Sequence, residues 1–179
     1  MSFREEIRLS GSGGQGLILV GKVLAEAAAI YDGLNATQSQ SYGPEARGGA
    51  SRSEVIISDG DIEYPKAENL DILLALTQEA CDKYHKDLKK GGILIVDKKM
   101  VKNLPGNDYK IVQLPIIQSD TERLGKFIVA NIISLGIIIK ISEVVSEEAV
   151  RQAIRTRVPK GTEDLNLKAF EEGMSLAEK

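Results

Sequence analysis

Glycines at positions 11, 13 and 16 separate a short apolar segment from a stretch with helical periodicity, and this arrangement constrains the fold more than any other feature of the chain. The preceding residues, Ile7–Ser10, are typical of a strand. From Leu17 to Ile30 apolar residues recur three and four positions apart, which predicts a helix. Asp32-Gly33 suits the end of that helix, with Gly33 as its C-terminal cap. The chain therefore opens with a predicted strand, a tight glycine-rich turn and a helix.

Two continuous apolar segments, 71–76 and 93–96, predict strands that are covered on both faces of a sheet. Further strands are predicted over 34–41, 51–58 and 110–114. Helices are predicted over 78–90, 121–124, 127–141 and 146–156. This order predicts an α/β fold: a mostly parallel sheet with helices on both faces, a Rossmann-like start and a helical C-terminal third.

We expect a single domain over residues 1–179, because no linker, repeat or low-complexity tract interrupts the chain. Residues 159–179 form a tail with an apolar stripe made of Leu165, Leu167, Phe170 and Met174. Such a stripe is expected to dock, either on this chain or on a partner.

The charge balance argues against several classes of partner. With a net charge of −3, nucleic acid and anionic membranes are poor candidates. The apolar run at 137–139 is too short to span a bilayer, and the N-terminus lacks the apolar stretch of an export signal. The single cysteine excludes an internal disulfide. We therefore expect a cytoplasmic protein.

The glycine turn is suited to an anion, because glycines allow close backbone approach and the amides at a helix start are unpaired. A dinucleotide site would also need an acidic residue at the end of the second strand. Asp32 lies near the required spacing but falls in the turn before that strand, which ends Gln38-Ser-Gln-Ser41 without an acid. Two interpretations stay open beside it: a phosphate or other ligand contact, and glycines that only permit tight packing of helix on strand.

A second glycine-rich cluster runs from Ser41 to Ala50 and contains three glycines, a proline, Tyr42 and Arg47. A planar guanidinium beside small residues suits a phosphate, a carboxylate or a partner chain. Because loops at the carboxyl ends of strands share one edge of a sheet, we predict that this cluster lies near the first. The alternative is an irregular surface turn with a solvated arginine.

These two clusters carry a resemblance to a known family. Gly11-Ser-Gly-Gly-Gln-Gly16 and Ser41-Tyr-Gly-Pro-Glu-Ala-Arg-Gly-Gly-Ala-Ser51 resemble the gamma subunit of 2-oxoacid:ferredoxin oxidoreductases. Similar stretches cover nearly the whole chain in order: 24–28, 73–76, 91–97, 124–131 and 135–136. The Tyr-Gly-Pro-Glu-Ala-Arg-Gly-Gly form is more similar to enzymes of the 2-oxoglutarate type than to those acting on pyruvate.

The resemblance implies a subunit of a hetero-oligomer that decarboxylates a 2-oxoacid oxidatively, passing the acyl group to coenzyme A and electrons to ferredoxin. It places thiamine diphosphate, Mg²⁺ and iron–sulfur clusters on alpha, beta and, where present, delta partner subunits. Residue chemistry agrees with that division, because a cubane cluster needs about four thiolates and Cys81 is the only cysteine. Apolar surface left by missing partners would favour a homodimer of the isolated chain.

We predict that the chain carries no catalytic residue and no metal ligand of its own. Cys81 and His85 share a helix face, but no third ligand lies nearby, so a buried thiol and a half-exposed imidazole are favoured. Asp97 either caps a turn or lines the sheet edge, and Lys98 and Lys99 are either solvated or contact a phosphate. The predicted cofactor-contacting residues come from the two clusters: Gly11, Gly13, Gly14, Gln15, Gly16, Ser41, Tyr42, Gly43, Arg47, Gly48 and Gly49.

Three hypotheses follow for the role of the chain. The first is an accessory gamma subunit whose glycine clusters face a partner's active site and contact coenzyme A. The second is a stand-alone nucleotide-binding enzyme that uses residues 11–16. The third is a purely architectural subunit without a ligand contact.

Overall fold

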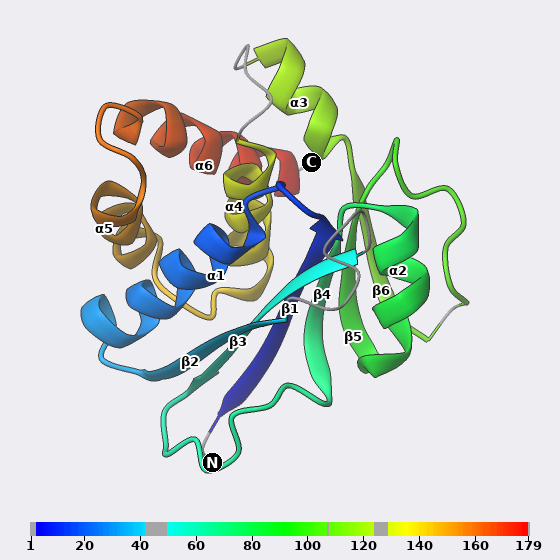
Figure 1. Cartoon of the computed structure of the whole chain (residues 1–179), viewed down its shortest axis with the longest axis horizontal. Helices are drawn as coiled ribbons and strands as arrows, with labels where there is room; N and C mark the ends of the chain where they lie inside the picture. The colour runs from blue at the N-terminus through cyan, green and yellow to red at the C-terminus, as the bar shows by residue number, and fades with distance from the viewer. Residues whose placement is uncertain (1–2, 42–49, 107, 124–128, 179) are drawn as a thin grey trace.

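The computed structural model describes residues 3–41, 50–106, 108–123 and 129–178. They form a six-stranded sheet, in the order β2-β3-β1-β4-β5-β6, with helices on both faces (Figure 1). The strands are β1 Arg4–Ser12, β2 Asn35–Ser41, β3 Ala50–Ser58, β4 Leu70–Ala75, β5 Leu88–Asp97 and β6 Lys110–Leu114. All strands predicted from the sequence are present.

The sheet is mixed but mostly parallel. Strands β1, β4, β5 and β6 are parallel neighbours, whereas β3 runs antiparallel to both β1 and β2. β3 therefore lies between β1 and β2, the two strands that the first helix connects. In a dinucleotide-binding fold these two strands would be adjacent. The start of the chain has the strand–turn–helix–strand order of a Rossmann fold, but its first two strands are not adjacent in the sheet.

Helices cover the two faces unequally (Figure 1). One face packs against α1 Leu17–Glu26, its π-helical extension η1 Ala27–Tyr31, α4 Ala130–Ser142 and α5 Glu147–Arg157. The other face packs against α2 Gln78–Tyr84, and α3 Ile116–Arg123 follows β6. In β4, Ile72 and Leu74 belong to the first core and Leu73 and Ala75 to the second. Two covered faces explain why this strand is continuously apolar in sequence.

The helix predicted over 78–90 is shorter in the structure. Thr77 caps its start by accepting a hydrogen bond from the Ala80 amide, but α2 ends at Tyr84 and β5 begins at Leu88. The register of β4 with β5 shifts just after Leu88, so residues 89–92 form an irregularity inside the strand. Gly91 adopts a φ of 75° there and its amide donates to the Asp108 carbonyl at 2.7 Å. Two glycines thus mark a bulge in a strand rather than a helix end.

The C-terminal tail folds as α6 Glu163–Ala177 and packs on α4 of the same chain. The contact is close because glycines face each other: a Cβ on Gly173 would lie 2.0 Å from the Ile133 carbonyl oxygen, and one on Gly136 would lie 2.2 Å from that of Phe170. The Phe170 side chain is fully buried beside this contact. Phe170 and Met174 are buried, and Leu165 and Leu167 are partly buried against the same core, so the apolar stripe of the tail packs on this chain.

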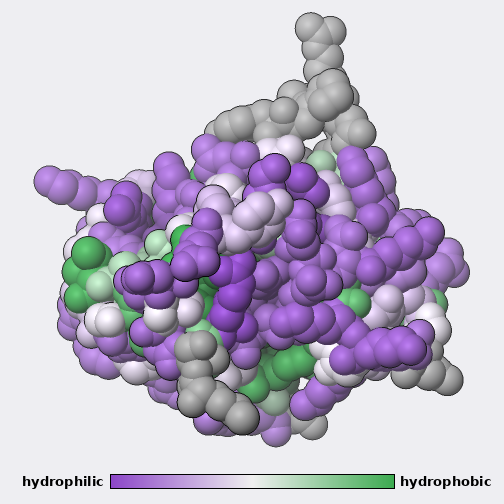
Figure 2. Space-filling model, turned by 90° about the horizontal axis from the view of Figure 1, so that it is seen from below, coloured by the Kyte–Doolittle hydropathy of each residue, from purple (hydrophilic) through white to green (hydrophobic). Residues whose placement is uncertain are grey.

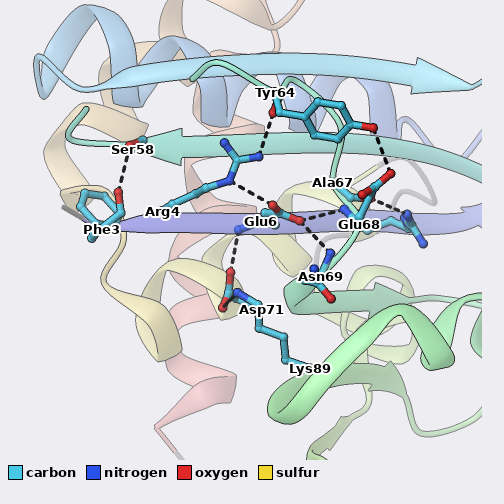
Figure 3. A network of polar contacts seen from close by, with 11 residues as sticks. Phe3, Arg4, Glu6, Ser58, Tyr64, Ala67, Glu68, Asn69, Asp71 and Lys89 are labelled. Carbon is cyan, nitrogen blue, oxygen red and sulfur yellow. Dashed lines mark hydrogen bonds and ion pairs between the residues drawn. The ribbon is translucent and has the colours of Figure 1, made fainter. Parts of the chain in front are cut away.

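The amino edge of the sheet is held by a network of charged side chains (Figure 3). The Glu6 carboxylate, which is 8% exposed, accepts hydrogen bonds from the amides of Glu68 and Asn69 and from Arg4. Asp71 accepts one from the Glu6 amide and one from the Lys89 ammonium, each at 2.8 Å. Satisfied carboxylates of this kind fix the β3–β4 connection against β1.

Seen from this amino edge, the surface is predominantly hydrophilic, and apolar side chains gather in only a few places (Figure 2). None of the helices in the described ranges is long and apolar enough to cross a membrane.

Replacing Gly173 with alanine is expected to lower the free energy of unfolding by about 2 kcal/mol. The added methyl meets backbone atoms of α4, which cannot yield without separating the helices, and this cost outweighs the helix propensity gained. Chemical denaturation measures the change. Gly106→Ala is the matched control, because a Cβ there meets nothing within 4 Å. Equal stability of the two variants would contradict the close α4–α6 contact.

Candidate functional site

The first glycine cluster connects β1 to α1 at the carboxyl edge of the parallel strands. β1 extends to Ser12, so Gly11 is part of the strand and the turn itself spans 13–16. Gly14 and Gly16 have φ values of 84° and 71°, a left-handed conformation that favours glycine. These two positions require glycine for the turn to form.

Gln15 folds back over the strand and braces the turn from inside. Its Oε1 accepts a hydrogen bond from the Ser12 amide at 2.8 Å. A Cβ on Gly11 would lie 2.0 Å from the same oxygen, so the glycine at 11 makes room for this side chain. The sequence predicts Gln15 as a ligand contact, and the structure shows its carbonyl oxygen engaged in holding the turn.

Asn131, at the start of α4, holds the other end of the turn, and the sequence analysis did not single it out as a site residue. Its Nδ2 donates to the Gly16 carbonyl at 3.1 Å, and a Cβ on Gly16 would lie 2.5 Å from that nitrogen. The side chain is buried. The sequence signal available was an amide side chain among apolar residues at the start of a predicted helix.

The outer surface of the turn is open. Gly13 and Gly14 are exposed, and a Cβ on either would meet nothing within 4 Å. α1 begins immediately after Gly16 without a side-chain cap and without an acidic residue in its first turn. The positive end of a helix dipole therefore faces this open space, where it favours an anion.

Most of the second glycine cluster, including Tyr42, Gly43, Arg47, Gly48 and Gly49, lies outside the described residues. Its two ends are described. Ala50 is paired with Ser12 of the first cluster, and Ser41 is paired with Arg52 on the neighbouring strand. Both ends of the 42–49 segment therefore start at the sheet edge that carries the first glycine turn.

A described guanidinium lies at the same edge, and sequence reasoning missed it. Arg52 of β3 lies 5.6 Å from the centroid of the Tyr84 ring and 3.5 Å from a Glu54 oxygen. Arg8 also lies over the Tyr84 ring, but it is 3% exposed and pairs with Glu54 and Asp87. Arg8 is thus buried in the core, whereas Arg52, the register partner of Ser10 in β1, is partly exposed.

The structure argues against a dinucleotide site, because the acidic residue that such a site requires is engaged elsewhere. Asp32, the acid nearest to the required spacing, accepts hydrogen bonds from the Ser146 amide and hydroxyl at 2.6 and 2.7 Å. Ser146 in turn caps α5 through the Ala149 amide. Asp32 therefore ties the end of the first helical segment to the start of α5, away from the glycine turn.

Cys81 and His85 have the surroundings of packing residues. The Cys81 thiol is fully buried, and burial, with a smaller contribution from Asp82, raises its pKa to about 11. The Nδ1 of His85 is buried without a hydrogen-bond partner, and its ring packs edge-to-face on Tyr109. Within the described ranges no three His, Cys, Asp or Glu side chains come together as a metal site would require.

Asp97 is fully buried, and the structure decides between its two interpretations. One carboxylate oxygen accepts hydrogen bonds from the amides of Lys99 and Met100, and the other accepts one from the Ile117 amide at 2.9 Å. Asp97 therefore caps the turn that follows β5 and anchors the start of α3.

The chain as a whole is similar to known proteins over nearly its full length. Residues 6–176 match the family described as pyruvate ferredoxin/flavodoxin oxidoreductase. The chain belongs to this family. Within it, the chain is 49% identical to 2-oxoglutarate synthase subunit KorC of Methanocaldococcus jannaschii, over 99% of this chain and 96% of that protein.

Two solved structures of the oxidoreductases share the fold. The gamma subunit of a keto/oxoacid ferredoxin oxidoreductase from Geobacter sulfurreducens is 53% identical, with a TM-score of 0.91 over 98% of this chain and 97% of that one. A 2-oxoglutarate:ferredoxin oxidoreductase from Magnetococcus marinus is 23% identical with a TM-score of 0.87. There the match covers 98% of this chain and 31% of the other, so the same fold also forms one part of a longer polypeptide.

In this oxidoreductase subunit the Cys81 thiol is expected to be inert in the native protein. A pKa near 11 leaves roughly 100-fold less thiolate at pH 8 than an ordinary thiol has, and the side chain is fully buried. A chromogenic disulfide reagent should therefore label the thiol only after unfolding in guanidinium, which serves as the control for reagent and stoichiometry. Rapid labelling of the native chain would show that Cys81 is an accessible nucleophile.

Proposed function

We propose that the chain is the gamma-type subunit of a 2-oxoacid:ferredoxin oxidoreductase complex and that it has no complete active site of its own. The observation that carries this proposal is the match along almost the whole length to a 2-oxoglutarate synthase subunit at 49% identity. The complex would convert a 2-oxoacid to an acyl-coenzyme A and carbon dioxide, with two electrons passed to ferredoxin. The same relatives, with the motif at 42–49, favour 2-oxoglutarate as the oxoacid.

The residues of the chain support an accessory role. Its one cysteine is buried and protonated at neutral pH, so the thiolates of an iron–sulfur cluster must come from other chains. The proposed partners are the alpha and beta subunits, and a delta subunit where one exists, with ferredoxin reached through the complex. Thiamine diphosphate and Mg²⁺ are assigned to those partners.

Coenzyme A is the ligand that we propose for the glycine turn. Its diphosphate is an anion of the kind that exposed amides and a helix N-terminus bind, and the space outside Gly13 and Gly14 is open. Arg47 is proposed as the main charged contact, with Tyr42, Gly48 and Gly49 beside it. When bound, coenzyme A supplies the thiol that accepts the acyl group. The role of this chain is to hold the diphosphate and so to position that thiol toward a partner's active site.

Co-production with its alpha and beta subunits should place the chain in a stable complex that reduces ferredoxin with 2-oxoglutarate and coenzyme A. The same complex should turn over pyruvate and 3-methyl-2-oxobutanoate at least tenfold more slowly. The reason is that an active site for 2-oxoglutarate, carried by the partner subunits, would be matched to the second carboxylate of that substrate. Initial rates with each oxoacid, measured on the purified complex, provide the comparison. Faster turnover of pyruvate than of 2-oxoglutarate would contradict the substrate assignment but not the subunit role.

Calorimetry on the isolated chain tests the nucleotide-binding alternative. NAD, NADP, ATP and coenzyme A are titrated separately into the purified chain. Under the proposed function, the isolated chain carries only part of the binding site and binds none of these nucleotides tightly. Micromolar binding of NAD or ATP without partners would favour a stand-alone enzyme.

Arg47→Ala in the assembled complex is expected to raise the KM for coenzyme A roughly tenfold or more, with the KM for 2-oxoglutarate unchanged, because a charge-assisted contact to phosphate is lost. Gly13→Ala should act in the same direction, because its methyl enters the open space without clashing inside the chain. Arg155→Ala, an exposed arginine on α5, is the matched control. An unchanged KM for coenzyme A in both site variants would favour a purely architectural subunit.

A further inference from the structure

The connection between β5 and β6 leaves the carboxyl edge of the sheet and runs along the outside of the molecule, at the right of the view (Figure 1). We call residues 98–104 the β5–β6 loop. Met100 and Leu104 in it are 44% and 40% exposed, which makes them two of the five large apolar side chains exposed among the described residues. The loop therefore presents apolar surface to solvent at two points.

The start of this loop is fixed by Asp97. The amides of Lys99 and Met100 both donate to one Asp97 carboxylate oxygen, at 2.8 and 2.9 Å. The Val101 amide donates to the Asp97 carbonyl at 3.0 Å, and the Val101 side chain is fully buried. Met100 thus lies in a turn whose amides, on Met100 itself and on both of its neighbours, are hydrogen-bonded to Asp97.

Gln78 of α2 fixes the second half of the loop. Its Oε1 accepts hydrogen bonds from the amides of Lys102 and Asn103, at 2.8 and 3.0 Å. The Lys98 amide is bound as well, to the Leu114 carbonyl at 2.9 Å. Six consecutive amides, 98–103, therefore have partners inside the chain. A loop held in this way loses little conformational entropy when a partner covers it.

The loop is also positively charged. Lys98, Lys99 and Lys102 are exposed, residues 98–106 contain no acid, and no described carboxylate forms an ion pair with any of the three ammonium groups. This concentration of charge stands out in a chain whose net charge is −3. An amide cradle for a phosphate is not available, because the amides of 98–103 are already bound. Side chains alone remain to meet a partner, and they are a mixture of apolar and cationic groups.

We propose that the β5–β6 loop is a docking surface for an acidic face of another subunit of the complex. Met100 and Leu104 enter an apolar hollow of that face, and the three lysines meet carboxylates around it. A centre of apolar contacts with a charged rim is the usual anatomy of a protein interface, and complementary charge selects the partner and its orientation. This inference rests on the proposed function, since it names the surface through which the gamma-type chain joins its partners.

The experiment uses the chain co-produced with its alpha and beta subunits, with the affinity tag on the alpha subunit. Two variants are compared with the wild type: Lys98→Glu/Lys99→Glu/Lys102→Glu and Met100→Ser/Leu104→Ser. Each should weaken the apparent affinity of the chain for the alpha–beta assembly at least tenfold at low ionic strength. Raising the salt should weaken assembly of the wild type and strengthen that of the charge-reversed variant, because salt screens the repulsion between its glutamates and the acidic face.

Matched controls separate docking from general effects of charge and hydrophobicity. Lys66→Glu/Lys160→Glu/Lys168→Glu reverses three exposed lysines elsewhere, and Ile30→Ser removes a side chain that is 68% exposed at the end of α1 and η1. Both controls should assemble as the wild type does. Thermal unfolding of each isolated variant, with an unchanged midpoint, shows that the substitutions act on the surface and not on the fold.

The outcomes distinguish this inference from the proposed function. If the wild type itself is not recovered with the alpha subunit, the proposed function fails. If the wild type assembles and both loop variants assemble equally well at every salt concentration, the inference fails and the function stands. If the loop variants assemble normally but lose a homodimer that the isolated wild type forms, the surface belongs to a second copy of this chain, and the inference is overturned.

Discussion

The antiparallel pairing of β3 with β1 is the interaction on which the arrangement of the site depends. It places Ala50 opposite Ser12, so the second glycine cluster returns to the sheet beside the first. It also separates β2 from β1, which removes the neighbourhood that a dinucleotide fold uses to bind ribose. One backbone pairing therefore favours a shared anion site and disfavours a nicotinamide cofactor.

The glycine turn is held by side-chain hydrogen bonds to the backbone at both of its ends. Gln15 occupies the space that a side chain at position 11 would fill, and Asn131 reaches the Gly16 carbonyl from α4. α4 is in turn held by α6 through the contact between Gly136 and Gly173. The C-terminal helix thus supports the glycine turn indirectly, through α4. Rigid support of this kind would let the exposed amides bind the proposed anion without reorganising.

The hydrophobic pattern was sufficient to predict most of the elements, because buried strands and amphipathic helices leave different periodicities. It was not sufficient at 85–92, where local glycines suggest a helix end and the pairing of β5 with β4 imposes a bulge. The position of β3 between β1 and β2 could not be predicted from the local sequence pattern either, since strand order depends on contacts between distant segments. The site shows the same division. Gly11–Gly16 were identifiable from spacing, whereas Asn131 reaches the turn only through tertiary packing.

The two edges of the sheet have different uses. At the amino edge, Glu6 and Asp71 are engaged with backbone amides and lysine, so this edge is closed by its own polar contacts. At the carboxyl edge, the open glycine turn follows β1 and the cationic β5–β6 loop follows β5, two strand spacings away, which is about 10 Å. A single partner face that docks on the loop would therefore also overhang the turn. Under the proposed function, assembly and ligand binding would then be linked, because the partner would supply further walls to the proposed anion site.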